Sequence, residues 1–196
     1  MVEIDLKGMK IAIIGIQGSG KTVLAKHFST KQKTVIYTPH WYEWEHQSKS
    51  FIYWVEGMRY LADMPVFMAA FKQSPTFKTV IIDEMDMLFR SNSNIDPMSN
   101  DMFLNHRHYG KTIIGITRRP QDIPPKFFES CHYIFIFTLD GKNAKDRLNA
   151  VYDNMGDMAA KLPYKSYYFI MKKIGEAPVL MKPIDTESLY IAQPKQ

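Results

Sequence analysis

Cysteine is almost absent from this sequence: of its 196 residues, only Cys131 carries a thiol. A single cysteine excludes an internal disulfide and a zinc site built from several cysteines, and it fits an intracellular, reducing setting. Because Cys131 precedes an apolar run, we interpret it as a small core residue rather than as a nucleophile.

Long hydrophobic runs are missing as well. No apolar stretch approaches the roughly 18 residues that a membrane span requires, and the start MVEIDLKGMK is mixed and charged. We therefore expect neither a transmembrane segment nor a signal peptide. Work at a membrane would require recruitment by a membrane-associated partner.

Acidic residues are the minority among the charges, with 20 Asp and Glu against 25 Lys and Arg, a net charge of +5. A positive excess favours an anionic partner such as nucleic acid, although nucleotide binding accounts for part of it. The length suits one domain over residues 1–196. We expect a core at about 8–140, followed by helices and a β-hairpin at 141–196.

What the sequence does contain is a glycine-rich turn in KIAIIGIQGSGKT, between an apolar run and a predicted helix. It fits the pattern G-x-x-x-x-G-K-[ST], in which backbone N–H groups and a helix N-terminus surround a phosphate chain. We expect Lys21 to reach the β- and γ-phosphates of ATP and Thr22 to bind Mg²⁺. The predicted nucleotide-binding residues are Gly15, Gln17, Gly18, Ser19, Gly20, Lys21, Thr22 and Val23.

Two adjacent carboxylates, Asp83 and Glu84, follow the apolar run TVII. A strand without polar alternation is typical of the centre of a parallel sheet, and ligands bind at the carboxyl ends of such strands. We expect Asp83 to help hold Mg²⁺ and Glu84 to accept the proton of the attacking water. The alternative is a solvated strand end that carries two acids.

Predicted strands alternate with predicted helices along the chain. Strands are expected at 11–14, 34–38, 78–82, 111–117 and 132–139, with a hairpin at 166–172 and 177–181. Helices are expected at 22–28, 51–62, 65–71, 102–109, 143–154 and 157–162, with a break at Pro65 and a polar loop at 91–100. This order predicts an α/β fold with a mostly parallel central sheet flanked by helices, the architecture of a P-loop NTPase.

Hydrolysis also needs a cation for the charge that develops in the transition state. Arg107, Arg118 and Arg119 are the candidates, and the last two leave a predicted strand at the nucleotide edge, where they would sense the γ-phosphate. For each, the alternative is a solvated surface arginine.

Two further segments allow two interpretations each. His40, Trp41, Tyr42, Trp44 and His46 form either a platform for a base or a neighbouring subunit, or a loop whose aromatic rings cover the core. The basic segment 142–147 either contacts DNA or is a solvated helix face.

The order GIQGSGKT, VIIDEMD and HRHYGKTIIGITRRPQDIP resembles the HerA/FtsK superfamily of hexameric DNA-pumping ATPases. Over roughly residues 10–125 it looks most like their viral branch, the packaging ATPases of membrane-containing icosahedral viruses such as the Sulfolobus turreted icosahedral viruses. The resemblance implies a RecA/FtsK-like fold, and it implies that Arg107, in an R-x-Y-G segment, is an arginine finger. Where the family has T-Q-R-P with a sensor glutamine, this chain has TRRP, so either Arg118 or Gln121 takes that role.

The resemblance also implies a function. We expect an ATP- and Mg²⁺-dependent motor, working as a homo-hexamer, that moves double-stranded viral DNA into a preformed capsid. Its partners would be DNA and capsid or portal and vertex proteins, in the host cytoplasm or on the virion. The alternatives are an ATPase for filamentous virion assembly or export of the zonula-occludens-toxin-like kind, and a nucleotide-gated adaptor that hydrolyses ATP slowly.

Overall fold

A computed structural model describes residues 5–45, 50–56, 59–89, 95–152 and 154–185. Within them, eight strands form one sheet in the order β3-β2-β4-β5-β1-β6-β7-β8. The strands from β3 to β6 in this order are parallel, and β7 and β8 are antiparallel. Their bounds are β1 Lys10–Ile14, β2 Thr34–Thr38, β3 Ser50–Trp54, β4 Thr79–Ile82, β5 Thr112–Thr117, β6 Tyr133–Ile136, β7 Phe169–Lys173 and β8 Val179–Met181.

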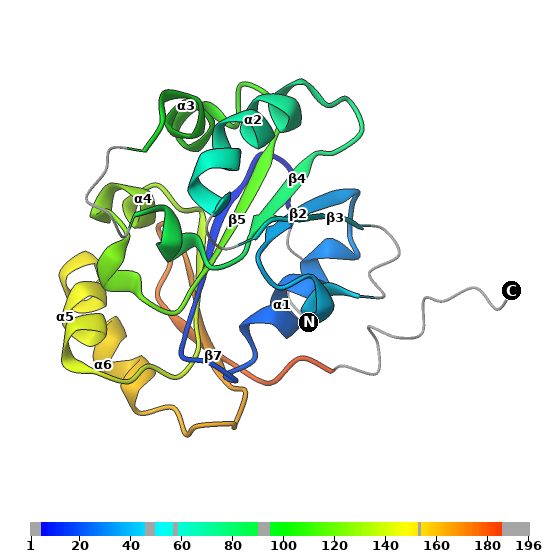
Figure 1. Cartoon of the computed structure of the whole chain (residues 1–196). Coiled ribbons are helices and arrows are strands. Elements are labelled where there is room, and N and C mark those ends of the chain that lie inside the picture. The colour runs from blue at the N-terminus through cyan, green and yellow to red at the C-terminus, as the bar shows by residue number, and fades with distance from the viewer. Residues whose placement is uncertain (1–4, 46–49, 57–58, 90–94, 153, 186–196) are drawn as a thin grey trace, which may run out of the picture.

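Helices cover both faces of this sheet (Figure 1). Their bounds are α1 Lys21–Ser29, α2 Tyr60–Gln73, α3 Pro97–Asn105, α4 Pro125–Glu129, α5 Lys142–Val151 and α6 Met155–Ala160. Short 3₁₀ turns lie at η1 Trp41–Trp44, η3 Met85–Leu88 and η4 Pro120–Asp122. The predicted α/β fold with a mostly parallel sheet and a C-terminal β-hairpin is confirmed.

Strand β1 is buried on both sides because its side chains alternate between two apolar clusters. Ala12 and Ile14 pack with residues of α2 to α6, whereas Ile11 and Ile13 pack with α1. A strand covered on both faces favours apolar residues at successive positions, which explains why Ile11–Ile14 shows no polar alternation.

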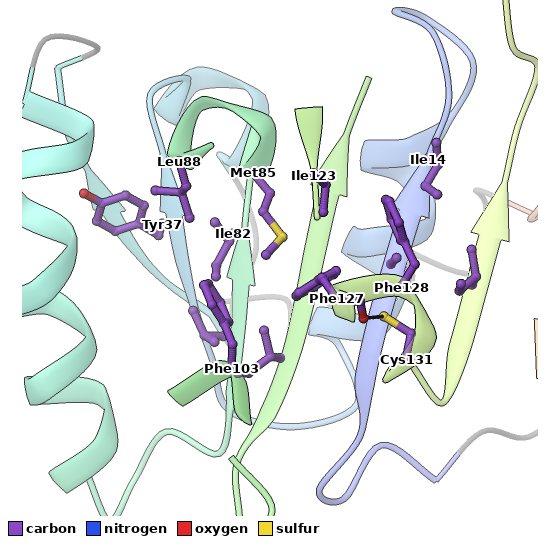
Figure 2. Packing of buried hydrophobic residues seen from close by; sticks show 14 of the residues in the cluster. Ile14, Tyr37, Ile82, Met85, Leu88, Phe103, Ile123, Phe127, Phe128 and Cys131 are labelled. Atoms are coloured by element: carbon purple, nitrogen blue, oxygen red, sulfur yellow. Dashed lines mark hydrogen bonds between the residues drawn. The ribbon is translucent and has the colours of Figure 1, made fainter. Parts of the chain in front are cut away.

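Figure 2 shows the cluster on the α2–α6 side, where Met85, Phe103, Phe127 and Phe128 fill the space over the sheet. Cys131 is 2% exposed, and its thiol donates to the carbonyl oxygen of Phe127 at 3.3 Å. Burial raises the pKa of this thiol to about 12. Cys131 is therefore a core residue, as predicted.

The helix predicted at 51–62 is wrong for 51–56, because Ser50–Trp54 is strand β3, paired in parallel with β2. Its last residues, 60–62, are helical as the start of α2. Residues 57 and 58 lie outside the described residues. The run FIYWV consists of β-branched and aromatic residues, which favour a half-buried strand. Pairing with the open edge of β2 satisfies the backbone of this run, and that is a contact the sequence alone does not reveal.

The break predicted at Pro65 is also wrong, since α2 continues through it from Tyr60 to Gln73. A proline inside a helix removes one backbone hydrogen bond and costs about 3 kcal/mol. Burial of one face of α2 offsets this cost, at roughly 1.5–3 kcal/mol for each large apolar side chain. The buried residues are Tyr60, Met64, Phe67, Met68 and Phe71.

Helix α3 starts earlier than predicted, at Pro97 instead of Met102, and ends at Asn105. The side chain of Asp96 caps it by accepting the Ser99 N–H at 2.9 Å, and proline is well suited to the first helical position. The polar loop prediction is therefore wrong for 97–100, and 91–94 lies outside the described residues. Turns, not a helix, occupy 106–110, and α4 was not predicted.

Candidate functional site

The glycine-rich loop joins β1 to α1 and is anchored between two neighbouring strands. The Gly15 N–H donates to the Thr117 carbonyl at the end of β5 (3.2 Å), and the Ile16 N–H donates to the Thr138 carbonyl after β6 (3.0 Å). A Cβ on Gly15 would lie 2.7 Å from Cβ of Phe137, so no larger residue fits. Gly20, with φ 108°, turns the chain into α1.

Lys21 is the first residue of α1, and its ammonium bonds back onto the loop. Its Nζ donates to the Ile16 carbonyl at 2.8 Å, and the Ser19 hydroxyl donates to the same oxygen at 2.8 Å. Burial lowers the pKa of Lys21, while the charges of Glu84 and Asp83 oppose that shift. The lysine therefore lies near both the loop and the carboxylates, where a phosphate oxygen can replace the Ile16 carbonyl as its acceptor.

Asp83 follows β4, and protein donors hold both of its carboxylate oxygens. Oδ2 accepts from the Thr38 hydroxyl (2.9 Å) and from the Trp44 indole N–H (3.1 Å). Oδ1 accepts the Glu84 N–H at 3.1 Å, and the Tyr60 hydroxyl donates to the Asp83 carbonyl. At 4% exposure, this carboxylate is fixed in orientation rather than solvated.

Glu84 adopts an unusual backbone conformation, with φ 53° and ψ 43°. A non-glycine residue in this left-handed region stores roughly 1–2 kcal/mol and persists where the surroundings impose it, often at functional sites. Its Oε2 forms an ion pair with Nε of Arg118 at 3.1 Å. Burial raises the pKa of Glu84, and Arg118 partly opposes this, which moves the carboxylate toward the range of a general base.

The structure adds a third acid, Asp86, that we did not assign from the sequence. It is completely buried in η3 and accepts from the Thr117 hydroxyl at 3.2 Å. Its charge acts on the pKa of both Lys21 and Glu84. The signal was an acid between Met85 and Met87, in a stretch that is otherwise apolar.

The predicted residues after β5 separate into two groups. Arg118 lies against Glu84, whereas Nε of Arg119 pairs with Asp122 at 2.6 Å. The side-chain oxygen of Gln121 is buried and has no hydrogen-bond partner among the described residues. The structure thus places Arg118 at the carboxylates, and its sensor role and that of Gln121 stay predictions.

Arg107 is exposed and lies at the amino ends of the parallel strands, opposite the carboxyl ends where Asp83 and Glu84 lie. It precedes the start of β5, and its Cγ would lie 3.9 Å from a Cβ on Gly8, just before β1. A five-residue strand such as β1 spans about 16 Å. Arg107 therefore does not reach the Lys21 and Glu84 of its own chain.

In the aromatic stretch at 40–46, one ring covers the core, as in the second of the two interpretations, and two rings remain exposed. Trp44 is fully buried in the core, whereas Trp41 and Tyr42 are 46% and 60% exposed. His46 lies outside the described residues. The basic segment 142–147 is mostly engaged within the fold, since Lys145 pairs with Asp157 at 3.2 Å and Arg147 donates to the Ile123 carbonyl at 2.7 Å.

The residues at this site fit Mg²⁺. The donors are oxygens, a hydroxyl on Thr22 and the fixed carboxylate of Asp83, and Mg²⁺ is usually held by one or two carboxylates together with substrate phosphates. In the described part of the chain, no three His, Cys, Asp or Glu side chains form a complete metal cage. Magnesium held partly by ATP does not need one.

Comparison with known proteins identifies the family. Residues 11–139 match the family described as "ATPase family associated with various cellular activities (AAA)". The chain belongs to this family of ATPases. It is a P-loop enzyme that hydrolyses nucleoside triphosphates, as expected. No curated protein matches the ATPase by sequence.

Solved structures share the fold of the ATPase. B204, the DNA-packaging ATPase from Sulfolobus turreted icosahedral virus, superposes with a TM-score of 0.73 at 18% identity, covering 92% of this chain and 100% of that one. The cytoplasmic domain of the type VII secretion ATPase EccC from Thermomonospora curvata gives 0.63 at 13% identity (91% and 26%). The N-terminal domain of zonular occludens toxin from Neisseria meningitidis gives 0.54 at 15% identity (93% and 97%).

The expected likeness to a viral packaging NTPase is thus confirmed at the level of the fold. Among the described residues, no helix is both long and apolar enough to cross a membrane.

Proposed function

We propose that the ATPase is a ring-forming motor that moves double-stranded viral DNA into a preformed capsid. The observation that carries this proposal is that the predicted catalytic residues lie at opposite ends of the parallel strands. Lys21, Asp83 and Glu84 lie together at the carboxyl ends of the strands, and Arg107 is exposed at their amino ends. A site of this kind is completed when a second copy presents its Arg107 to the first.

The chemistry of one site follows from its contacts. The loop N–H groups and Lys21 bind the phosphates, and Thr22 and Asp83 would hold Mg²⁺, which would supply positive charge beside the phosphates. Glu84 takes the proton of the attacking water once Arg118 turns from the carboxylate toward the phosphate. Arg107 from the neighbouring subunit stabilises the transition state, an effect worth roughly 10³-fold or more in rate.

The packaging role is supported by the likeness to B204, which is described as a DNA-packaging ATPase and whose full length this chain covers. The net charge of +5 suits an anionic polymer as the track. A homo-hexamer and capsid, portal or vertex proteins as partners belong to the same proposal.

The likeness to the zonular occludens toxin domain favours a second candidate, an ATPase for filamentous virion assembly or export. The export ATPase predicts association with a membrane-bound partner, and the packaging motor predicts association with a capsid vertex. Pull-down with each class of partner separates the two.

The deciding experiment measures ATP hydrolysis against protein concentration, with and without double-stranded DNA. A motor ring shows specific activity that rises with concentration and is stimulated by DNA. Glu84→Gln is the control: it retains ATP binding and loses about 10²–10⁴-fold in rate, as expected for removal of a general base. Activity that DNA and concentration both leave unchanged would contradict the motor and favour the nucleotide-gated adaptor.

A further inference from the structure

The segment that joins α6 to β7, PYKSYY at 163–168, lies against the glycine-rich loop although it is distant in sequence. A Cβ on Gly18 would lie 3.2 Å from the hydroxyl of Tyr164, and a Cβ on Gly20 would lie 3.2 Å from Cδ1 of Tyr167. The Thr138 hydroxyl donates to the Pro163 carbonyl at 3.2 Å. The backbone oxygen of the same Thr138 also anchors the loop, so both segments are fixed to the end of β6.

The backbone of this segment is unusual at two positions. Lys165 and Tyr167 both have φ 59°, in the left-handed region that bulky side chains rarely adopt. Their neighbours Tyr164 and Tyr168 keep ordinary φ values. The hydroxyl of Tyr164 and the ring of Tyr167 thus lie beside the loop, and the two residues are still 55% (Tyr164) and 47% (Tyr167) exposed.

Exposed aromatic rings beside a phosphate-binding loop are suited to contact the base of the nucleotide whose phosphates the loop binds. On the side of the loop that faces β5 and β4, the charged side chains of Arg118 and Glu84 lie at the ends of the strands. On the β6 side, the tyrosines offer neutral, flat surfaces, and any base presents a π-face that can stack on an aromatic ring. Nζ of Lys165 lies 5.5 Å from the centroid of the Tyr164 ring and adds a cation next to it.

We propose that the 163–168 segment is the base-binding subsite of the ATPase. The purine ring of the bound nucleoside triphosphate stacks on Tyr164, while Tyr167 packs against Gly20 and supports the loop. This inference rests on nucleotide binding by the loop, and it does not depend on DNA translocation. Stacking does not read the edge of a base, so ATP and GTP benefit similarly.

The test compares two ligands on the full-length protein by isothermal titration calorimetry: ATP, and inorganic tripolyphosphate, which carries the phosphates without a base. Tyr164→Ala lowers the affinity for ATP roughly tenfold, the usual order of magnitude for loss of one base-stacking contact. It leaves tripolyphosphate affinity unchanged. Tyr164→Phe keeps the ring and binds ATP like the unmodified protein. Phe51→Ala, which removes a similarly exposed aromatic ring from β3 at the far edge of the sheet, is the matched control and changes neither affinity.

Each contrary result identifies a different error. Equal weakening of both ligands by Tyr164→Ala would show that the ring only supports the loop. Loss of affinity in Tyr164→Phe would assign the contact to the hydroxyl and a phosphate. An unchanged ATP affinity in Tyr164→Ala would leave no base subsite on this ring. Binding of both ligands as described, without stimulation of hydrolysis by DNA, would contradict the motor and leave the base subsite intact.

Discussion

At the scale of single residues, the contact between Trp44 and Asp83 connects the aromatic stretch to the carboxylate that we propose holds Mg²⁺. The indole is fully buried, and its N–H donates to Oδ2 at 3.1 Å. Trp41, three positions earlier on the same 3₁₀ turn, is 46% exposed. A displacement of η1 at the surface would therefore change how Asp83 is held.

We predict that Trp44→Phe keeps most of the packing but removes this donor. The free energy of unfolding should fall by about 1–3 kcal/mol, from the lost hydrogen bond and a small cavity. Because Asp83 is then held less firmly, the Mg²⁺ concentration for half-maximal hydrolysis should rise. Trp41→Phe is the matched control and should leave both quantities unchanged. If Trp44→Phe lowers stability but not the response to Mg²⁺, Trp44 acts through packing alone.

His106 is a second residue whose surroundings lead to a measurable prediction. It is 3% exposed, and its ring lies 6.2 Å from that of His132. Burial, with Lys10 and His132 nearby, lowers its pKa to about 4. The unfolded chain therefore binds a proton at higher pH than the folded protein, so stability is full above about pH 6.5 and is lost as the pH falls toward 4.

Urea denaturation at pH 7.5 and pH 5 measures this loss. His106→Gln should reduce the difference between the two free energies of unfolding, whatever its effect on stability at pH 7.5. His108→Gln, at an exposed position two residues later, should retain the difference of the unmodified protein. A difference that His106→Gln leaves intact would assign the proton linkage to other groups, His132 first.

At the scale of elements, α2 is the helix whose local sequence conflicts most with its structure. Pro65 lies six positions into it, where its missing N–H leaves the Leu61 carbonyl without its usual helical partner. The helix also carries Tyr60, whose hydroxyl holds the Asp83 carbonyl, so its start is tied to the site. Packing and this contact stabilise a helix that local propensity would end.

We predict that Pro65→Ala raises the free energy of unfolding by about 1–2 kcal/mol. The restored hydrogen bond contributes up to about 3 kcal/mol to stability. The greater conformational entropy of the unfolded chain without proline lowers stability by roughly 1 kcal/mol. Pro97→Ala, at the first position of α3, is the control and should be neutral or slightly destabilising, since no hydrogen bond is available there. Chemical denaturation of both variants decides the question, and a destabilised Pro65→Ala would contradict it.

At the scale of the whole molecule, the sheet separates Arg107 from the carboxylates by the length of its strands. If Arg107 acts on a neighbouring subunit, Arg107→Ala and Lys21→Ala should each abolish hydrolysis. A mixture of the two should recover part of it, because some interfaces then combine an intact loop with an intact Arg107. Absence of recovery in mixed rings that still assemble would transfer the role to Arg118 or Arg119.

Much of the fold was predictable because parallel strands and their helices leave local signals. The runs at β1, β4, β5 and β6 are buried at every position and consist mostly of apolar residues, and the glycine pattern identifies the loop. Strand β3 and the full length of α2 were not predictable. The first depends on pairing with β2, and the second depends on packing that outweighs a proline.

The sequence by itself determined the chemistry of the loop, because G-x-x-x-x-G-K-T requires only adjacent residues to position N–H groups and a lysine. It also determined that two acids follow an apolar strand. Only the tertiary structure decided what those acids contact: Trp44 and Thr38 on Asp83, Arg118 on Glu84, and the tyrosines of 163–168 beside the loop. The reason is physical: such contacts form between strand ends that meet in the sheet but are far apart in the chain.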